Sequence, residues 1–184
     1  MLRTQSLQQE NALAQRVLRI ALFTGLLVLA TKAEIWFGGP VPFTLQVLAV
    51  LLAGMLLGAR DGALSVLSYL GLIAVNLPVD SAGIGAAAFA GPTAGYLVGF
   101  VPAAYAAGWL TEQSQNRIWL RWLAGLVGIS VIYAIGLTWL KLVTGGSWSQ
   151  AWQWGAYPFL GLDLLKALLA ALLVEVMVRT SNDT

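Results

Sequence analysis

The chain has 184 residues, of which 59% are hydrophobic and only 10% charged, with a mean hydropathy of +0.79 and a formal net charge of +2. A soluble domain carries about 25% charged residues, so this composition indicates a protein whose surface faces lipid. The small and scattered positive charge excludes a nucleic-acid-binding surface. The absence of cysteine and histidine excludes disulfides, thiol nucleophiles and the commonest zinc ligands, and with them much enzyme chemistry.

The hydropathy pattern predicts an all-α membrane protein with six transmembrane helices in a single integral membrane domain. Residues 1–16 are expected to form a cytoplasmic N-terminal arm, residues 17–178 the six-helix bundle, and residues 179–184 a cytoplasmic tail. Each expected span is an apolar run of about 14 to 22 residues, bounded by charged residues or by glycine and proline. The six runs are Val17–Ala33, Thr44–Leu57, Gly62–Val75, Gly95–Leu110, Leu120–Leu140 and Gly161–Val178.

The connections between these runs differ in character. EIWFGGPVPF after the first run contains two glycines and two prolines, which predict a bend at the membrane face. GARDG predicts a charged turn between the second and third runs. The segment NLPVDSAGIGAAAFAGPTAG, between the third and fourth helices, is rich in glycine and only weakly polar. Because unpaired backbone at membrane depth must be satisfied by protein or by a water-filled cavity, we expect this segment to form an outer cap loop that lines a cavity.

Basic residues in the connections predict the orientation. With six spans and a cytoplasmic N-terminus, all seven arginines fall on the cytoplasmic side, whereas Lys32 and Lys141 fall outside. The sequence therefore predicts a multi-pass protein of the cell membrane, with the N-terminus and the C-terminus both cytoplasmic.

Asp163 and Lys166 are the most informative polar residues inside an expected span. Their spacing of three places both side chains on one face of the last helix, near its outer end. They can form an internal ion pair that neutralises itself, or a clamp in which the carboxylate accepts N–H groups and the ammonium donates to a carbonyl or pairs with an acid. The spacing does not choose between these interpretations.

Other candidates each have a structural alternative. Gln46 can bind a ligand or make an interhelical hydrogen bond, and Asn76 can bind a ligand or occupy a turn. GPTAGY can present backbone N–H groups to a ligand at the start of a helix, or can serve only to bend, cap and pack that helix; its candidate residues are Gly91, Thr93, Gly95 and Tyr96.

Two further features concern surfaces. Ala21 and Gly25 form a small-xxx-small pattern on the first helix, which allows a partner protein or a neighbouring helix of the same chain to approach closely. The aromatic residues of the last outer connection, among them Trp148, Trp152 and Trp154, are typical of interfacial membrane anchors; the alternative is a lid over an apolar ligand ring.

The combination of VPFTLQ (residues 41–46), GPTAGY (91–96) and D-x-x-K (163–166), in this order, resembles the BioY family, the biotin-specific S components of energy-coupling factor (ECF) transporters. The resemblance covers most of Val41 to Leu173. It implies the six-helix S-component fold, with biotin as transported ligand rather than cofactor, in a pocket near the outer face. It also implies partners in the membrane: a transmembrane coupling protein and two ATPase subunits. The chain itself has no G-x-x-x-x-G-K-[ST] phosphate loop.

On the matching positions, Asp163 is expected to accept a ureido N–H, and Lys166 to meet either the ureido oxygen or the tail carboxylate. Gln46 and Asn76 would complete the amide-type contacts, and Gly91 to Gly95 would approach the ligand through backbone atoms. The segment DSAGIGAAAFA offers few polar side chains, so an anchor from the cap would have to be backbone. Lys32 and Glu34 receive no role.

Three other functions compete with biotin uptake, and the oligomeric state, including a homo-oligomer, is undecided. An S component for another vitamin would use the same fold. A non-transport structural membrane subunit would use the small-residue stripe without a cavity. An intramembrane enzyme is disfavoured, because an aspartic protease would need a second intramembrane aspartate and Asp61 and Asp80 are expected in loops.

Overall fold

A computed structural model describes residues 2–115 and 117–182, and it describes side-chain burial for residues 9–115 and 117–180. The described chain is almost entirely helical. Six long helices cover the six predicted apolar runs: α1 (Leu2–Lys32), α2 (Gln46–Leu57), α3 (Ala59–Ala74), α4 (Ala94–Glu112), α5 (Ile118–Thr144) and α7 (Leu160–Asn182). The remaining elements are a pair of two-residue strands, β1 (Glu34–Ile35) and β2 (Phe43–Thr44), the 3-10 helix η1 (Gly85–Ala90) and the short helix α6 (Trp148–Gly155).

The helices extend further than the hydropathy runs at both ends of the chain. From Leu2 onward, the residues of the expected N-terminal arm continue α1 without a break, and α7 runs through the expected tail as far as Asn182. Met1 and residues 183–184 of the tail lie outside the described residues. Two described helical segments, Gln9–Lys32 and Ile118–Thr144, are by themselves long and apolar enough to cross a membrane.

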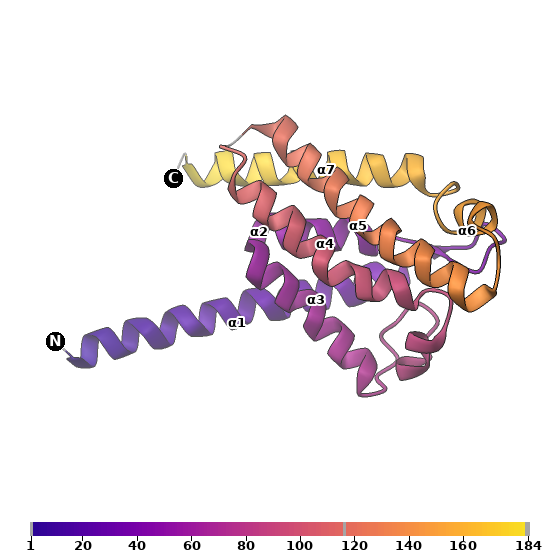
Figure 1. Cartoon of the computed structure of the whole chain (residues 1–184). Helices are drawn as coiled ribbons and strands as arrows, with labels where there is room; N and C mark the ends of the chain where they lie inside the picture. Colours follow the sequence, from indigo (N-terminus) through magenta and orange to yellow (C-terminus); the bar gives the residue numbers. More distant parts are fainter. Residues whose placement is uncertain (1, 116, 183–184) are drawn as a thin grey trace.

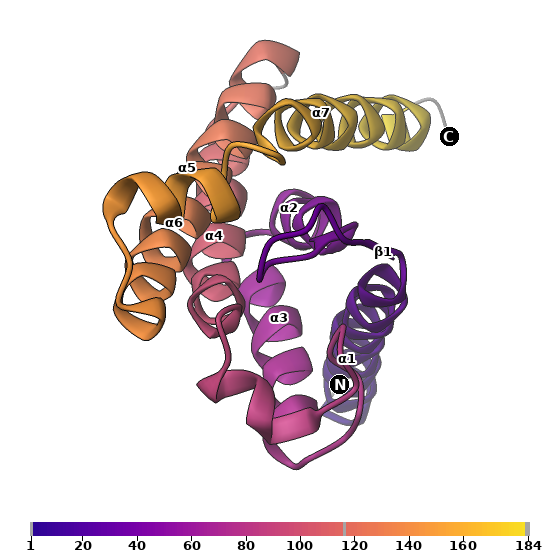
Figure 2. The same cartoon turned by 90° about the vertical axis from the view of Figure 1, so that its right-hand side faces the viewer.

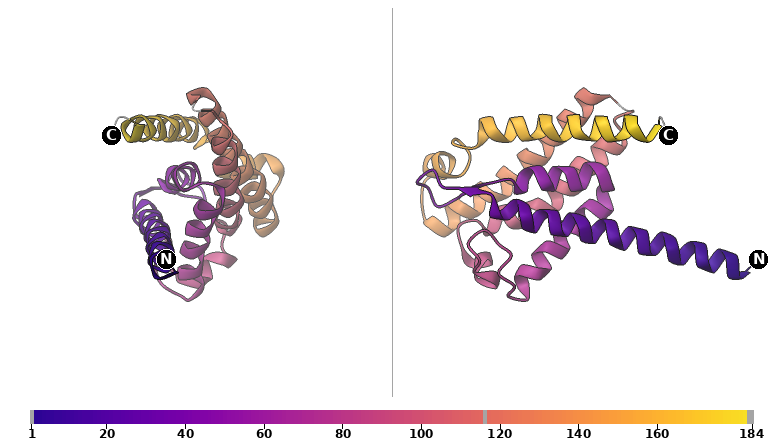
Figure 3. Two further views of the ribbon diagram at one scale, coloured as in Figure 1. Left: turned by 90° about the vertical axis from the view of Figure 1, so that its left-hand side faces the viewer. Right: turned by 180° about the vertical axis from the view of Figure 1, so that it is seen from behind.

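The long helices lie side by side, with the two termini at one end of the molecule (Figure 1). We call this the termini end. The β1–β2 connection, η1 and α6 gather at the other end, which we call the loop end (Figures 1 and 2). Seen from behind, the N-terminal half of α1 projects well beyond the other helices (Figure 3).

Glycines let α2, α3 and α4 cross at very short distance. A Cβ at Gly54 would lie 2.1 Å from the carbonyl oxygen of Ala104, and a Cβ at Gly108 would lie 2.6 Å from the amide nitrogen of Ala59. A Cβ at Gly62 would lie 2.5 Å from the Cα of Gly54. Any side chain at these positions would collide with backbone, so the three glycines define how closely the helices pack.

The GARDG segment forms a smaller turn than the sequence predicts. Gly58 alone connects α2 to α3, with a φ of +85° that favours glycine. Arg60 and Asp61 lie in the first turn of α3, where a carboxylate is favoured by the helix dipole. Asp61 is therefore a helical residue, not the loop residue expected from the sequence.

Charged side chains link neighbouring helices at the termini end, through ion pairs and a hydrogen bond to a backbone amide. The guanidinium of Arg16 on α1 donates to the carboxylate of Asp61, with the shortest bond at 2.6 Å. Arg121 on α5 is buried and pairs with Glu175 on α7. Glu112 at the end of α4 accepts the amide N–H of Ala59 at 2.8 Å. Each contact joins two different helices.

The helix α6 was not predicted from the sequence. It begins with a capping box in which the Ser147 hydroxyl accepts the amide N–H of Gln150, and the Gln150 side chain accepts the amide N–H of Ser147. The hydroxyl of Tyr96 on α4 donates to the carbonyl oxygen of Gly155 at 3.0 Å. This bond holds the end of α6 over the loop end of the bundle.

Candidate functional site

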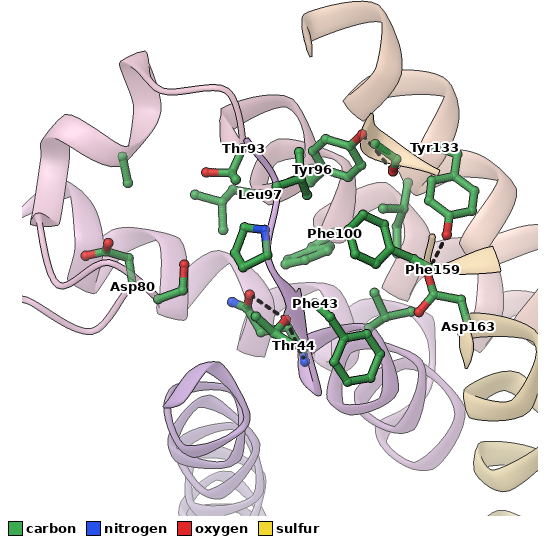
Figure 4. Close-up of a pocket in the computed structure, with 18 of the residues that line it drawn as sticks. Phe43, Thr44, Asp80, Thr93, Tyr96, Leu97, Phe100, Tyr133, Phe159 and Asp163 are labelled. Atoms are coloured by element: carbon green, nitrogen blue, oxygen red, sulfur yellow. Dashed lines mark hydrogen bonds between the residues drawn. The ribbon is translucent and has the colours of Figure 1, made fainter. Parts of the chain in front are cut away.

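A cavity at the loop end is lined in part by the β1–β2 connection and by the segment that joins α3 to α4. The empty space between its lining residues is about 780 Å³, a volume that includes the part open to solvent. Most of its wall is apolar, with a few polar groups at opposite sides (Figure 4). Its lining includes Phe43, Thr44, Gln46, Asp80, Thr93, Tyr96, Leu97, Phe100, Tyr133, Phe159, Asp163 and Lys166.

Asp163 and Lys166 lie together on the pocket wall. Asp163 is in the first turn of α7 and Lys166 follows one turn later, so both side chains point to the same side of the helix. The ammonium of Lys166 donates to Asp163 Oδ1 and to the carbonyl oxygen of Thr44, both at 2.7 Å. Both side chains are buried, with 3% of Asp163 and 5% of Lys166 exposed. The two sequence interpretations are thus compatible, because the ion pair forms and also borders a cavity.

Two aromatic residues complete this polar cluster. The hydroxyl of Tyr133 on α5 donates to Asp163 Oδ2 at 2.5 Å. The ring of Phe43 lies below Lys166, with its centroid 4.0 Å from the ammonium nitrogen, at a distance that allows a cation–π interaction. Neither residue was predicted as part of the site. Nothing in the local pattern of α5 distinguishes Tyr133 from an interhelical packing residue, and the apolar side chain of Phe43 gives no polar signal within VPFTLQ.

The cluster keeps hydrogen-bonding capacity for a ligand. A carboxylate offers about four acceptor positions and an ammonium three donors. The protein uses one hydrogen bond at each Asp163 oxygen, and two of the Lys166 donors. A ligand with an N–H next to a carbonyl can therefore donate to Asp163 and accept from Lys166 without displacing either protein contact.

Gln46 lies at the pocket and begins a buried hydrogen-bonded chain. Its Oε1 accepts the Thr44 hydroxyl at 3.1 Å, and its Nε2 donates to the hydroxyl of Tyr69 on α3 at 2.8 Å. The Tyr69 hydroxyl lies 3.1 Å from Thr31 Oγ1 on α1. The structural alternative for Gln46, an interhelical hydrogen bond, is present in the fold, and the residue also lines the cavity.

The segment between α3 and α4 forms one wall of the pocket and is folded around Asp80. Only 3% of this residue is exposed, and its two carboxylate oxygens accept the amide N–H groups of Ile84 at 3.1 Å and Gly85 at 2.7 Å. The ammonium of Lys32, at the end of α1, donates to the carbonyl oxygens of Pro78 at 3.3 Å and Asp80 at 3.0 Å. These contacts give Lys32 a role that the sequence did not suggest, and they show Asp80 to be a buried pocket residue.

Three of the candidate residues lie outside the pocket lining. Asn76 is exposed with a φ of +66°, and its Oδ1 accepts the amide N–H of Ala86 at 3.2 Å. The Gly91 carbonyl oxygen accepts the indole N–H of Trp139 at 2.9 Å. A Cβ at Gly95 would lie 2.3 Å from the Cβ of Trp139. For these three residues the structure favours the turn and packing alternatives.

The other two candidate residues of the GPTAGY motif, Thr93 and Tyr96, do line the pocket. Tyr96 lies on α4 between Thr93 and the Asp163 cluster in the close-up, and its hydroxyl points away to Gly155 (Figure 4). The surface residues Ala21 and Gly25 are both exposed on α1, and a Cβ at Gly25 would meet no atom within 4 Å. Packing within the described part of the chain therefore does not explain this small-residue stripe.

Comparisons with known proteins agree with one another. The profile described as "BioY family" matches residues 3–183. A "Biotin transporter BioY" from Rhizobium etli is 44% identical over 143 residues, covering 73% of this chain and 76% of that protein. A protein of the same description from Thermotoga maritima is 38% identical over 160 residues, covering 86% of this chain and 93% of that protein. The solved S component for biotin from an ECF-type ABC transporter has a TM-score of 0.84 at 25% identity, over 92% of this chain and 93% of that one.

Proposed function

The chain belongs to the BioY family and acts in biotin transport as the S component of an ECF-type ABC transporter, and from this premise we propose that biotin binds in the pocket at the loop end. The observation that carries the proposal is the Asp163–Lys166 cluster beside the cavity. Being a transporter subunit, the chain is not an enzyme, and we propose no covalent chemistry for its site.

Biotin carries a ureido group with two N–H donors and one carbonyl, an apolar sulfur ring and a carboxylated tail. In the proposed complex Asp163 accepts a ureido N–H and Lys166 donates its third N–H to the ureido oxygen. The pairing of Lys166 with Asp163 at 2.7 Å supports this assignment. A tail carboxylate at the same ammonium would instead bring two acids together in a buried site.

The rest of the pocket suits the apolar part of the ligand. The rings and side chains of Phe100, Leu97 and Phe159 are available to pack against the sulfur ring and the methylene tail. Gln46 and Thr93 remain candidate polar contacts. Asn76, Gly91 and Gly95 lie outside the described lining and make turn and packing contacts. Their contact with the ligand stays a prediction.

In the membrane, we propose that α1 to α5 and α7 make the six crossings, with the termini end in the cytoplasm and the pocket facing outward. The position of both termini at one end and the arginine pattern support this orientation. Biotin enters from the outside and is released inside after a reorientation driven by ATP. The energy comes from partners, a transmembrane coupling protein and two ATPase subunits. The exposed stripe with Ala21 and Gly25 on α1 is the proposed contact with the coupling protein.

The direct test measures binding of labelled biotin to the purified full chain in detergent. We expect Asp163→Asn and Lys166→Ala to weaken binding by about a hundredfold or more, because each leaves one partner of a buried charged pair unpaired. Asp61→Asn removes a carboxylate at the termini end and is the matched control, expected to bind as the wild type does. Unchanged affinity in both pocket variants would remove these residues from the site. Competition by thiamine and riboflavin, which we expect to fail, tests the alternative of another vitamin.

A further inference from the structure

The charged residues of the pocket are distributed unevenly around its wall. Two carboxylates, Asp80 and Asp163, and one ammonium, that of Lys166, are the acidic and basic side chains in the described lining. In the close-up, Asp80 and Asp163 lie on opposite sides of the pocket, with Leu97 and Phe100 between them (Figure 4). The pocket therefore has one more negative than positive group, and its ammonium is paired with the carboxylate beside it at 2.7 Å.

This distribution does not suit an anionic tail. If the ureido group occupies the Asp163–Lys166 cluster, the methylene tail runs along the apolar middle of the pocket, toward the wall around Asp80 or out through the opening. At that wall the tail carboxylate would meet a second buried carboxylate, which is unfavourable where solvent screening is weak. The lining also carries the hydroxyls of Ser81 and Thr93, which are uncharged groups that can donate a hydrogen bond to the tail carboxylate.

Lys32 contacts the backbone of this wall. Its ammonium donates to the carbonyl oxygens of Pro78 and Asp80, and the residue is not part of the lining. Lys32 thus holds the backbone of the wall through two carbonyl oxygens, and it does not line the cavity.

We infer that the pocket recognises biotin through its ureido ring and apolar body and makes no ionic contact with the side-chain carboxylate. Its substrate class therefore includes biotin whose carboxyl is masked as an amide or an ester. This inference rests on the proposed function, because it needs the ureido group at Asp163 and Lys166. It adds that the free acid is not required for recognition.

The test is a competition series against labelled biotin, using the full wild-type chain in detergent. The competitors are unlabelled biotin, its primary amide and its methyl ester; lipoic acid and its amide, which share the five-carbon tail but lack the ureido group, are the controls. We expect the biotin amide and ester to compete within tenfold of biotin, and both lipoyl compounds to fail. Tenfold, about 1.4 kcal/mol, is near the lower end of what a hydrogen bond between charged groups contributes. A loss greater than tenfold for both masked compounds would overturn the inference.

A variant of Lys32 separates support of the wall from contact with the ligand. Lys32→Gln is expected to change the affinities for biotin and biotin amide by the same factor, so that their ratio stays as in the wild type. If Lys32→Gln lowered the affinity for biotin more than the affinity for biotin amide, the carboxylate would lie at Lys32. That result would contradict the inference. The two proposals fail separately: if labelled biotin binds without dependence on Asp163, the proposed site is wrong, whereas if biotin binds through Asp163 and the amide does not compete, only the further inference is wrong.

Discussion

The loop end and the termini end are held together by different kinds of contact. At the termini end, glycines bring backbones closer than a methyl group allows, and ionic contacts join helix to helix. At the loop end, side chains hold connecting segments by hydrogen bonds, as Lys32 holds Pro78 and Asp80 and as Asn76 holds Ala86. The difference suggests a division of labour in which the termini end provides stability and the loop end provides recognition. Substitutions at the two ends should therefore change different measurements.

The largest expected effect is on stability, from Gly54→Ala at the helix crossing. The new Cβ would lie 2.1 Å from the Ala104 carbonyl oxygen, and relief requires α2 and α4 to separate. We expect a loss of about 3 kcal/mol, at the upper end of ordinary overpacking costs, measured as a lower unfolding temperature in detergent. The matched control is Gly71→Ala on α3, where the Cβ meets no atom within 4 Å; there we expect a gain of about 0.5 kcal/mol. If both variants unfold at the same temperature, close packing does not stabilise this end.

A smaller effect, on binding rather than stability, is expected from Tyr133→Phe. The ring is kept, and only the hydroxyl that donates to Asp163 at 2.5 Å is lost. Because this bond orients the carboxylate, we expect biotin affinity to fall by about tenfold, with little change in unfolding temperature. Tyr105→Phe, on an exposed face of α4, is the control that should change neither. In an Asp163→Asn background the hydroxyl should matter far less; an equal loss in both backgrounds would show that Tyr133 acts independently of Asp163.

The smallest effect is expected from Arg16→Gln at the termini end. Arg16 pairs with Asp61 in an ion pair that is partly exposed to solvent, and exposed pairs contribute little to stability. We expect no measurable change in unfolding temperature and unchanged biotin binding, in contrast to Gly54→Ala at the same end. A clear destabilisation would mean that the projecting half of α1 depends on this contact for its position.

Hydropathy predicted the long helices because a chain in lipid must satisfy its backbone hydrogen bonds within helices. It placed their ends less well, since residues 2–16 are polar enough to resemble a solvated arm yet continue α1. The helix α6 is too short for a hydropathy signal. Its S-x-x-Q capping pattern at Ser147 and Gln150 is visible in the sequence and could have located its start.

Site residues could be predicted where they share one helix, because their spacing in the sequence then gives their relative positions. They could not be predicted where residues from several segments meet in the fold. Asp163 and Lys166 share a helix face, so their spacing alone predicted that they would meet. Tyr133 contacts Asp163 although the two residues are 30 positions apart in the sequence. Asp80 is buried because the segment between α3 and α4 folds around it. Asn76 and Gly95 were candidates for ligand contact with a structural alternative each, and the fold does use them for a turn and a helix contact. Their contact with a ligand stays a prediction.

The single-residue junction at Gly58 leaves no slack between α2 and α3. Each inserted residue that continued either helix would rotate the following one by about 100° and shift it by about 1.5 Å. It would also pull the amide of Ala59 away from Glu112. Over evolutionary time, length variation among homologous chains should therefore accumulate in the segments around the pocket mouth and be rare at this junction, so that transporters of this type can diversify in ligand while inheriting the same hairpin.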